Sequence, residues 1–285
     1  MDTNFIVIFS YFIVIYRIVQ LYEVLIAMSF QNQFTKTTTD ANLMETVHHG
    51  SAEYPFRYYY ENIALFDFKC IDWHWHSELE FIYIESGNVV FDIGTVHFEL
   101  NEGNGIMINS KILHRLQSSS DAIIPNFLFQ PSFIAPQDSL IYKKYINPVI
   151  SSSLEYLVFQ PDIPWQKKAL EIIKTIIAVQ ETEFNREIIV SMSVQQLWIL
   201  LLENLTFDQF ENMGAVISRT RLQLMMQYVH AHYSENITLE DIARTANISK
   251  STALHLFQNN LKLTPVKYLI NYRLKQAALL LINTE

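Results

Sequence analysis

The spacing of apolar residues changes near residue 160 and divides the chain into a strand-like part and a helix-like part. Between Phe56 and Gln130, short apolar and aromatic runs alternate with turn-forming residues, as in LEFIYIESG and VVFDIG. Runs of this kind predict β-strands, with hairpin turns at Ser86–Asn88 and Ile93–Thr95. Many short strands at close spacing favour a small barrel or sandwich.

Beyond Trp165, apolar residues recur every three or four positions in WQKKALEIIKTIIAVQ and in EIIVSMSVQQLWILLLENL. This period predicts two helices. The second helix is apolar on nearly all of its surface, so it must be buried. The pattern is equally compatible with two arrangements. The helix can form an interface between two copies of the chain, or it can pack within one chain. The residues expected at such a dimer interface are Leu197, Leu200, Leu201 and Leu205.

Four more helices are expected after residue 217, and each has its own start signal. The expected N-caps are Ser218, Thr238, Ser249 and Thr264. Asp241 stands three residues after Thr238 and completes a capping box, and Pro265 suits the first position of the last helix. The first helix has one apolar face, formed by Leu222, Met225, Met226 and Val229.

The second and third of these helices have the spacing of a helix-turn-helix. Counted from Leu239, the motif requires apolar residues at positions that here hold Ile242, Ala246, Ile248, Ala253 and Leu256. Ala243 supplies the small residue where the two helices meet, and Asn247 takes the usual glycine position, because Asn tolerates a left-handed backbone. The pattern therefore predicts DNA binding, with generic helix packing as the alternative.

The third of these helices is then the element that enters DNA. Its outward face is expected to present Lys250, Ser251, Thr252, Leu254, His255, Gln258 and Asn259. Lys and Gln can hydrogen-bond to base edges, and Leu can contact a thymine methyl group. Arg244, before the turn, and Lys262, beyond the helix, are expected near phosphates. Leu254 is alternatively a core residue, because its neighbour Ala253 is small.

The charge distribution supports this interpretation even though the whole chain is acidic. The net charge of the 285 residues is −9, but residues 217–285 hold eight basic and four acidic residues, so this region has a charge of +4 and the remainder −13. A basic region on an acidic body suggests a phosphate-binding face. Cys70 is the single cysteine, which excludes an intrachain disulfide and fits a reducing, cytoplasmic location.

The first residues, FIVIFSYFIVIYRIVQLYEVLIAM from Phe5 to Met28, are long enough to span a membrane. Arg17 in their middle makes insertion costly, and the segment lacks the basic start and the cleavage site of a secretory signal. Three interpretations stay open: translated sequence upstream of the true start, which we favour, a membrane anchor, or a packed helix. Residues 29–46 are polar and indicate a linker.

The segment DWHWHSELEFIYIESG carries the densest set of chemically active side chains. His74, His76 and Glu80 share one face of a strand, because all three have even numbers, and His114 is a possible fourth member. Two or three imidazoles and a carboxylate can bind a divalent metal. They can also line a small-molecule pocket, which we favour, or belong to a packed core. His97 is interpreted as structural, and no cofactor is expected.

The spacing His-x-His-x3-Glu-x6-Gly, ending at Gly87, resembles the first signature of the cupin barrels, and NSKILH takes the place of the second. Asn109 and Lys111 replace the Pro and Gly of that second signature, which weakens its turn but keeps His114. Together with YRLKQAALLL near the end, the barrel and helix-turn-helix resemble the AraC family of transcription regulators over about Tyr54 to Glu285.

The resemblance implies an α+β fold: a cupin-like β-barrel, linking helices and an all-α helix-turn-helix domain. The implied division is 1–43 for the apolar segment and linker, 44–160 for the effector-binding domain, 161–216 for the linking and dimerisation helices, and 217–285 for DNA binding. It implies double-stranded DNA, a homodimer and a small-molecule effector, a sugar or a related polar molecule, at His74, His76, Glu80 and His114. It implies neither an enzyme nor a membrane protein.

The family carries two helix-turn-helix units, and the sequence ends where the second is expected. We therefore expect a truncated regulator with reduced DNA affinity, which dimerisation could partly restore. The alternatives are an effector-domain remnant that does not bind DNA, a metal-dependent cupin enzyme with His74, His76, Glu80 and His114 as ligands, and a membrane-tethered sensor. The effector, the operator sequence and the choice between activation and repression do not follow from the sequence.

Overall fold

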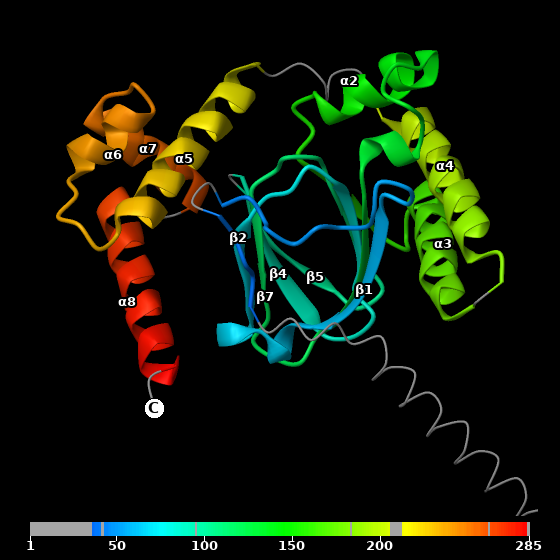
Figure 1. The fold of residues 1–285 in the computed structure, drawn as a ribbon, viewed down its shortest axis with the longest axis horizontal. Coiled ribbons are helices and arrows are strands. Elements are labelled where there is room, and N and C mark those ends of the chain that lie inside the picture. Colours follow the sequence, from blue (N-terminus) through cyan, green and yellow to red (C-terminus); the bar gives the residue numbers. More distant parts are fainter. Residues whose placement is uncertain are drawn as a thin grey trace, which may run out of the picture.

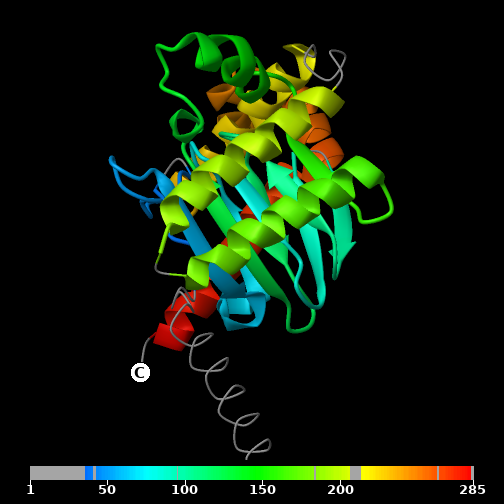
Figure 2. The ribbon, with the colours of Figure 1, turned by 90° about the vertical axis from the view of Figure 1, so that its right-hand side faces the viewer.

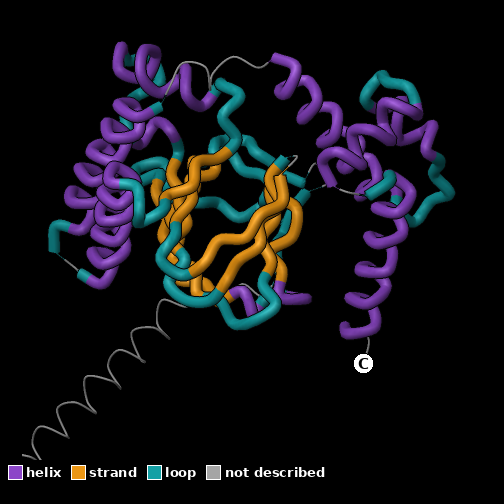
Figure 3. Tube along the Cα trace, turned by 180° about the vertical axis from the view of Figure 1, so that it is seen from behind, coloured by secondary structure: helices purple, strands orange, loops and turns teal. Residues whose placement is uncertain are grey.

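The computed structural model describes residues 36–40, 43–94, 96–182, 184–205, 213–261 and 263–283. It shows a β-barrel with helices on two sides (Figure 1). Seen from behind, the strands form the middle of the molecule and the helices form two separate groups (Figure 3). The expectations for Phe5–Met28 and for Lys262 concern residues outside the described part of the chain. The four-part domain division also stays a prediction.

The barrel consists of two antiparallel sheets. The five-stranded sheet has the order β1 (Phe56–Asn62), β8 (Ile123–Phe129), β3 (Leu79–Tyr83), β6 (Gly105–Ile108) and β9 (Tyr156–Phe159). The four-stranded sheet has the order β2 (Cys70–His74), β7 (His114–Gln117), β4 (Asn88–Ile93) and β5 (Val96–Asn101). Short helices η1 (Ile63–Leu65), η2 (Asp67–Lys69) and η3 (Pro131–Phe133) connect strands.

Alternation along the strands explains how the barrel closes. In β4, Val89, Phe91 and Ile93 are buried between the sheets, whereas Asp92 points to the outer surface. Gly94 has a φ of 53° and makes the hairpin turn between β4 and β5, which confirms the turn expected at Ile93–Thr95. The other expected hairpin is wrong, because β3 and β4 belong to different sheets and Ser86–Asn88 crosses between them.

Helices α3 (Pro164–Ala178) and α4 (Arg186–Asn204) cover the five-stranded sheet (Figure 2). Segment η5 (Val179–Glu181) follows α3, and η4 (Tyr142–Ile146) with α2 (Asn147–Ile150) precedes β9. Three of the four leucines considered for a dimer interface are buried in the core shared by α3, α4 and this sheet. They are Leu197, Leu200 and Leu201. For these three leucines the structure thus agrees with the second alternative, packing within one chain, and not with an interface between two copies.

The last four helices are α5 (Met213–His232), α6 (Leu239–Thr245), α7 (Lys250–Leu261) and α8 (Pro265–Asn283). The apolar face of α5 is buried in their common core, as expected, and Trp73 and Leu113 of the barrel join that core. Ser218 is not an N-cap, since the apolar residues before it continue α5 back to Met213. No helix in the described part combines the length and hydropathy needed to cross a bilayer.

Strands concentrated before residue 160 and helices concentrated after it confirm the expected α+β fold.

Candidate functional site: a helix-turn-helix and a buried histidine cluster

The start of α6 has the expected capping box. The amide of Asp241 donates to Thr238 Oγ1 at 3.2 Å, and the amide of Thr238 donates to Asp241 Oδ2 at 2.9 Å. These two bonds satisfy backbone donors that the first turn of a helix leaves without partners. The hydrogen bonds at Thr238 lower the pKa of Asp241, so its carboxylate stays charged at the helix N-terminus.

The turn between α6 and α7 is built as the sequence predicts. Asn247 has a φ of 52°, the left-handed conformation that the usual glycine would adopt. The amide of Ile248 donates to Ala243 O at 3.2 Å and closes the turn. Ser249 then caps α7, because its Oγ accepts from the amide of Thr252 at 3.2 Å. The two hydrogen bonds and the left-handed conformation of Asn247 hold the two helices at a defined relative position.

The packing between the helices confirms most of the expected core. Ile242, Ala243 and Ala253 are buried, and Ala243 leaves room for the close approach of α7. Phe257 is fully buried in the same core, although the sequence motif placed the apolar position at Leu256, which is half-buried. The available signal was spacing: Phe257 follows Ala253 by four residues and therefore lies on the same helix face.

The outward face of α7 is open to solvent. Lys250, Ser251, His255 and Gln258 are exposed, and Thr252 and Leu254 are half-buried. Lys250 Nζ lies 3.3 Å from Glu240 Oε2, and the exposed guanidinium of Arg244 lies 3.7 Å from Asp241. Exposed ion pairs of this kind contribute little stability. Both cations are therefore able to exchange their carboxylate for a phosphate at small cost.

A second chemically active region lies inside the barrel, where three buried imidazoles converge. His74 on β2 is paired in register with His114 on β7, and the ligand atoms of His74, His76 and His114 lie within 4.8 Å of one another. Glu80 on β3 approaches from the opposite sheet, with Oε2 3.3 Å from His76 Nε2 and 3.1 Å from His114 Nε2. The structure thus brings together all four predicted residues, which we call the histidine cluster. The expected single strand through His74, His76 and Glu80 is wrong, because the chain leaves β2 at His74 and enters the opposite sheet at β3.

Backbone carbonyls orient the three rings. The Nδ1 atoms of His74 and His114 lie 2.7 Å and 2.9 Å from the carbonyl oxygens of Asp72 and Ile112, and His76 Nδ1 lies 3.3 Å from Glu78 O. A carbonyl accepts only, so Nδ1 carries the proton of each neutral ring and Nε2 is left as the acceptor or ligand atom. His114 Nε2 is misaligned for a hydrogen bond to Glu80 despite its proximity, and has no hydrogen-bond partner among the described residues.

Burial and mutual contacts shift the protonation of the cluster. Burial, reinforced by the neighbouring His114, lowers the pKa of His74 to about 4. Burial also opposes ionisation of Glu80, but the contacts with His114 and His76 outweigh it and hold the pKa of Glu80 well below its usual range. The same contact with Glu80 overcomes burial at His76 and raises its pKa. The cluster therefore keeps a carboxylate beside at least one neutral imidazole.

Sequence reasoning missed a layer of residues around this cluster. His49 is buried, its Nδ1 lies 2.8 Å from Tyr59 Oη, and its Nε2 lies 3.1 Å from Glu45 Oε2. The His49 ring also meets the edge of His76, with centroids 5.7 Å apart. No periodic signal marks His49, because it precedes the first strand and reaches the cluster only through the path of the folded chain.

The histidine cluster fits a single metal ion better than a larger ligand. Three imidazoles and one carboxylate are a donor set that divalent transition metals accept, and the partnerless Nε2 of His114 is the kind of atom that a metal satisfies. A metal held there would supply Lewis acidity. The neighbouring cavity measures about 40 Å³, which admits water but is far below the few hundred Å³ of usual ligand pockets.

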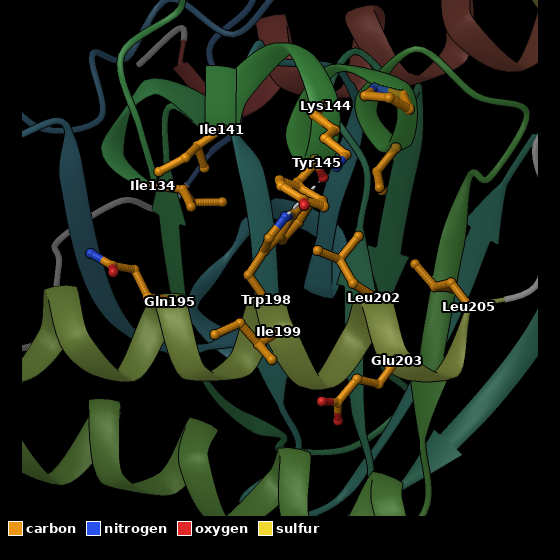
Figure 4. A pocket seen from close by; sticks show the side chains of 12 residues that line it. Ile134, Ile141, Lys144, Tyr145, Gln195, Trp198, Ile199, Leu202, Glu203 and Leu205 are labelled. Atoms are coloured by element: carbon orange, nitrogen blue, oxygen red, sulfur yellow. Dashed lines mark hydrogen bonds between the residues drawn. The ribbon is translucent and has the colours of Figure 1, made fainter. Parts of the chain in front are cut away.

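A larger apolar groove lies outside the barrel, between α4 and the η4–α2 segment (Figure 4). It measures about 780 Å³, and Trp198 Nε1 donates to Tyr145 O at 3.1 Å beside it. Its apolar walls are formed by Ile134, Ile141, Pro148, Val149, Ile199, Leu202 and Leu205. Leu205 is the fourth leucine considered for a dimer interface. It lines the groove and is only half-buried.

Comparison with known proteins agrees with both regions. Residues 66–136, which include the histidine cluster, match the AraC-like ligand binding domain. An uncharacterised HTH-type transcriptional regulator of Bacillus subtilis, YdeC, is 33% identical over 253 residues, covering 86% of this chain and 85% of that protein. The lactose operon transcription activator of Staphylococcus xylosus is 25% identical over 163 residues, covering 55% of this chain and 58% of that protein.

Among solved structures, ToxT from Vibrio cholerae is similar at 14% identity, covering 76% of this chain and 98% of that one, with a TM-score of 0.34. This likeness is too low to carry an argument. The family is shown by the match to the Bacillus regulator, which covers most of both proteins. The match to the ligand-binding domain over the barrel and the helix-turn-helix of α6 and α7 agree with it. The chain belongs to the AraC family of HTH-type transcriptional regulators and is a ligand-controlled, DNA-binding regulator.

Proposed function

We propose that α7 is the recognition helix and reads base edges in the major groove. Lys250, Ser251, Thr252, Leu254, His255 and Gln258 form its reading face, while Arg244 and Lys262 contact phosphates. The observation that carries this proposal is the open outward face of α7 on a helix-turn-helix that is capped at both helix starts. This placement follows the docking geometry of helix-turn-helix proteins. We also propose that the chain works in the cytoplasm, because the relatives that it matches are bacterial transcriptional regulators.

Selection from a random duplex library tests this proposal. The full chain is incubated with the library across a salt series, and bound DNA is sequenced. We expect one enriched motif. Lys250→Ala and His255→Ala should weaken binding to it by about 1–3 kcal/mol each, the range of a base contact. Lys168→Ala removes another exposed lysine, from α3, and should change nothing. Salt-sensitive binding without a motif would refute specific recognition.

We propose that the effector is a neutral sugar or a related polar molecule. Support comes from the relative in Staphylococcus xylosus, whose name is lactose operon transcription activator. His74, His76, Glu80 and His114 are the effector-binding residues that the sequence predicts. The small cavity beside them admits a sugar ring only if cluster side chains move.

A metal-dependent cupin enzyme is the second candidate, because the same four residues form a good metal donor set. Since the homologous proteins are transcriptional regulators, we propose that the chain is not an enzyme. Metal analysis of the full chain purified without chelators separates the candidates. Stoichiometric metal that is lost in His114→Ala would establish a metal site, whereas metal-free protein removes the enzyme hypothesis.

We propose a homodimer that uses α4 and the adjoining groove. The outer face of α4 exposes Ile188, Met192 and Ile199 in one stripe, which continues into the groove at Leu202. Exposed apolar patches of this extent usually mark protein interfaces. These residues are separated by four, seven and three positions, and the polar Gln195 stands between Met192 and Ile199, so the stripe keeps the average spacing of helix pairs that pack side by side.

Sedimentation equilibrium of the full chain tests the dimer. Ile199→Asp should shift the equilibrium toward monomer, because it buries a charge in an apolar interface. Leu65→Asp is the matched control, since Leu65 is 50% exposed and Ile199 57%, but Leu65 lies on η1 away from α4. A wild-type chain that stays monomeric at all concentrations would exclude this interface.

A further inference from the structure

A pocket of about 470 Å³ lies between the barrel and the DNA-binding helices, along a line that we call the seam. One wall is the outer face of the four-stranded sheet, with Asp72, Asp92 and Arg115. The other wall is α8, with Asn271, Tyr272 and Lys275. Figure 1 shows α8 running beside β2. The volume falls within the range of about 300–1,000 Å³ typical of small-molecule sites.

The seam pocket is separate from the histidine cluster, because the four-stranded sheet stands between them. On β7, His114 and Leu116 face the barrel interior, while Arg115 and Gln117 line the seam. On β2, His74 faces inward and Cys70 faces the seam. Successive residues of a strand point to opposite faces, so a ligand at the seam does not touch the cluster.

The charges at the seam are compensated in pairs. Arg115 donates from Nε and Nη2 to Asp92 Oδ2 at 3.0 Å and 2.8 Å, and Lys275 Nζ pairs with Asp72 across the seam. Among the lining residues that the structure describes, the two cations thus match the two carboxylates. A charged ligand would have to break one of these pairs, whereas a neutral ligand would not. Asn271 and Gln117 add carboxamides, each of which can donate and accept.

Aromatic rings provide flat apolar surface beside these polar groups. Tyr272 lines the pocket and is half-buried, whereas Trp73 and Tyr268 line it with only 7% and 6% of their surface exposed, and Arg115 covers Trp73 at 5.4 Å from the ring centroid. Phe68 stands at the rim with 54% of its surface exposed. Phe68 and Lys69 have φ values of 58° and 51°, a left-handed pair that is strained for residues with side chains. Strained backbone concentrates at ligand-binding positions, and here it presents an aromatic ring to the pocket.

We propose that the seam pocket binds a neutral, polyhydroxylated small molecule of the saccharide class, and that this is the effector site. Ring faces of such a molecule would lie on the aromatic side chains, and its hydroxyl groups would bond to Asn271, Gln117 and the ion-paired groups. This inference rests on the proposed sugar effector and moves it from the histidine cluster to the seam. Because the walls belong to the barrel and to α8, the ligand stabilises their docked arrangement and thereby changes how α7 is presented to DNA.

Saturation-transfer NMR with the full chain provides the test, using a panel of neutral mono- and disaccharides that begins with lactose. We expect at least one member to bind. Ala278→Trp fills the pocket from α8 and should weaken that binding about tenfold or more, because the added indole occupies the ligand volume. Ala277→Trp is the matched control, since residue 277 is exposed and does not line the pocket.

The outcomes separate this inference from the proposed DNA-binding function. Loss of saccharide binding in Ala278→Trp, with Ala277→Trp and His114→Ala unchanged, supports the seam site. Loss in His114→Ala with binding kept in Ala278→Trp assigns the ligand to the histidine cluster and overturns the inference. Failure of the whole panel also overturns it. The DNA-library selection is carried out on the same protein without saccharide. Only a selection that yields no motif counts against DNA recognition, whatever the result with saccharides.

Discussion

His230 should make the regulator lose stability as the pH falls, because its ring is held neutral in the folded protein. On α5, His230 Nε2 lies 2.7 Å from Tyr268 Oη, and its ring stacks on Tyr272 with centroids 3.8 Å apart. Burial is the main reason that the pKa of His230 falls from 6.5 to about 4; the charge of Asp72 partly opposes this shift, and the charge of Lys275 adds a smaller lowering. The unfolded chain, by contrast, takes up the proton near the ordinary value.

The sign of the effect follows from this difference. Below the unfolded pKa of 6.5 the unfolded state binds a proton that the folded state does not, so falling pH favours unfolding until the folded pKa near 4 is reached. At 1.36 kcal/mol per pKa unit, the loss from about pH 7 to about pH 5 is about 2 kcal/mol. We treat it as an upper value, since the His230 ring keeps some contact with solvent.

Urea unfolding of the full chain, followed by circular dichroism at both pH values, measures this loss. His230→Phe keeps the ring stacking but gives up the hydrogen bond, so it should be about 1 kcal/mol less stable than wild type near neutral pH. It should be the more stable protein near pH 5, because it has no proton to take up. Tyr268→Phe, which removes the bond but keeps the histidine, should retain most of the wild-type pH dependence. Parallel pH curves for wild type and His230→Phe would refute the reasoning.

Three further substitutions test the local structure, each by thermal or urea unfolding. Lys111 has a φ of 62°, so Lys111→Gly should raise the stability by about 1 kcal/mol by relieving a left-handed backbone; a loss would contradict this strain. Phe257→Ala empties a fully buried position between α7 and α8 and should cost about 3–5 kcal/mol, together with DNA binding. Thr238→Ala breaks the capping box and should cost about 1 kcal/mol, whereas Thr238→Ser should keep most of it.

The parts that the sequence predicts well are those set by neighbouring residues. A capping box needs only Thr238 and Asp241, and the turn at Asn247 needs one residue that tolerates positive φ. His74, His76 and Glu80 do converge, but the reason given from the period of two is wrong, because β2 ends at His74, His76 lies between strands, and Glu80 is on β3 of the other sheet. Helix caps and turns that depend on residues close together in the sequence were therefore predicted correctly.

The parts that the sequence predicts poorly depend on which distant surface covers an apolar face. The pattern in α4 requires burial of Leu197 and Leu201, but it does not say whether α3 or a second chain provides the cover. Similarly, Gly87 indicates a turn at Ser86–Asn88, while the sheet that receives β4 is decided by tertiary pairing. His49 is the clearest case, because only the folded path places it beside His76.

A single irregularity in β2 explains how one strand serves both the barrel interior and the seam. Ile71 pairs with Leu116 and His74 pairs with His114, so β2 has one residue more than β7 between the two pairs, which is a β-bulge. The extra residue lets Ile71 and His74 both face inward, while Asp72 and Trp73 both face the DNA-binding helices. Asp72 pairs with Lys275 there, and its own carbonyl oxygen holds His74 Nδ1. The backbone that orients the cluster is therefore the same backbone that contacts α8, and the two sites share a physical connection even though the sheet separates them.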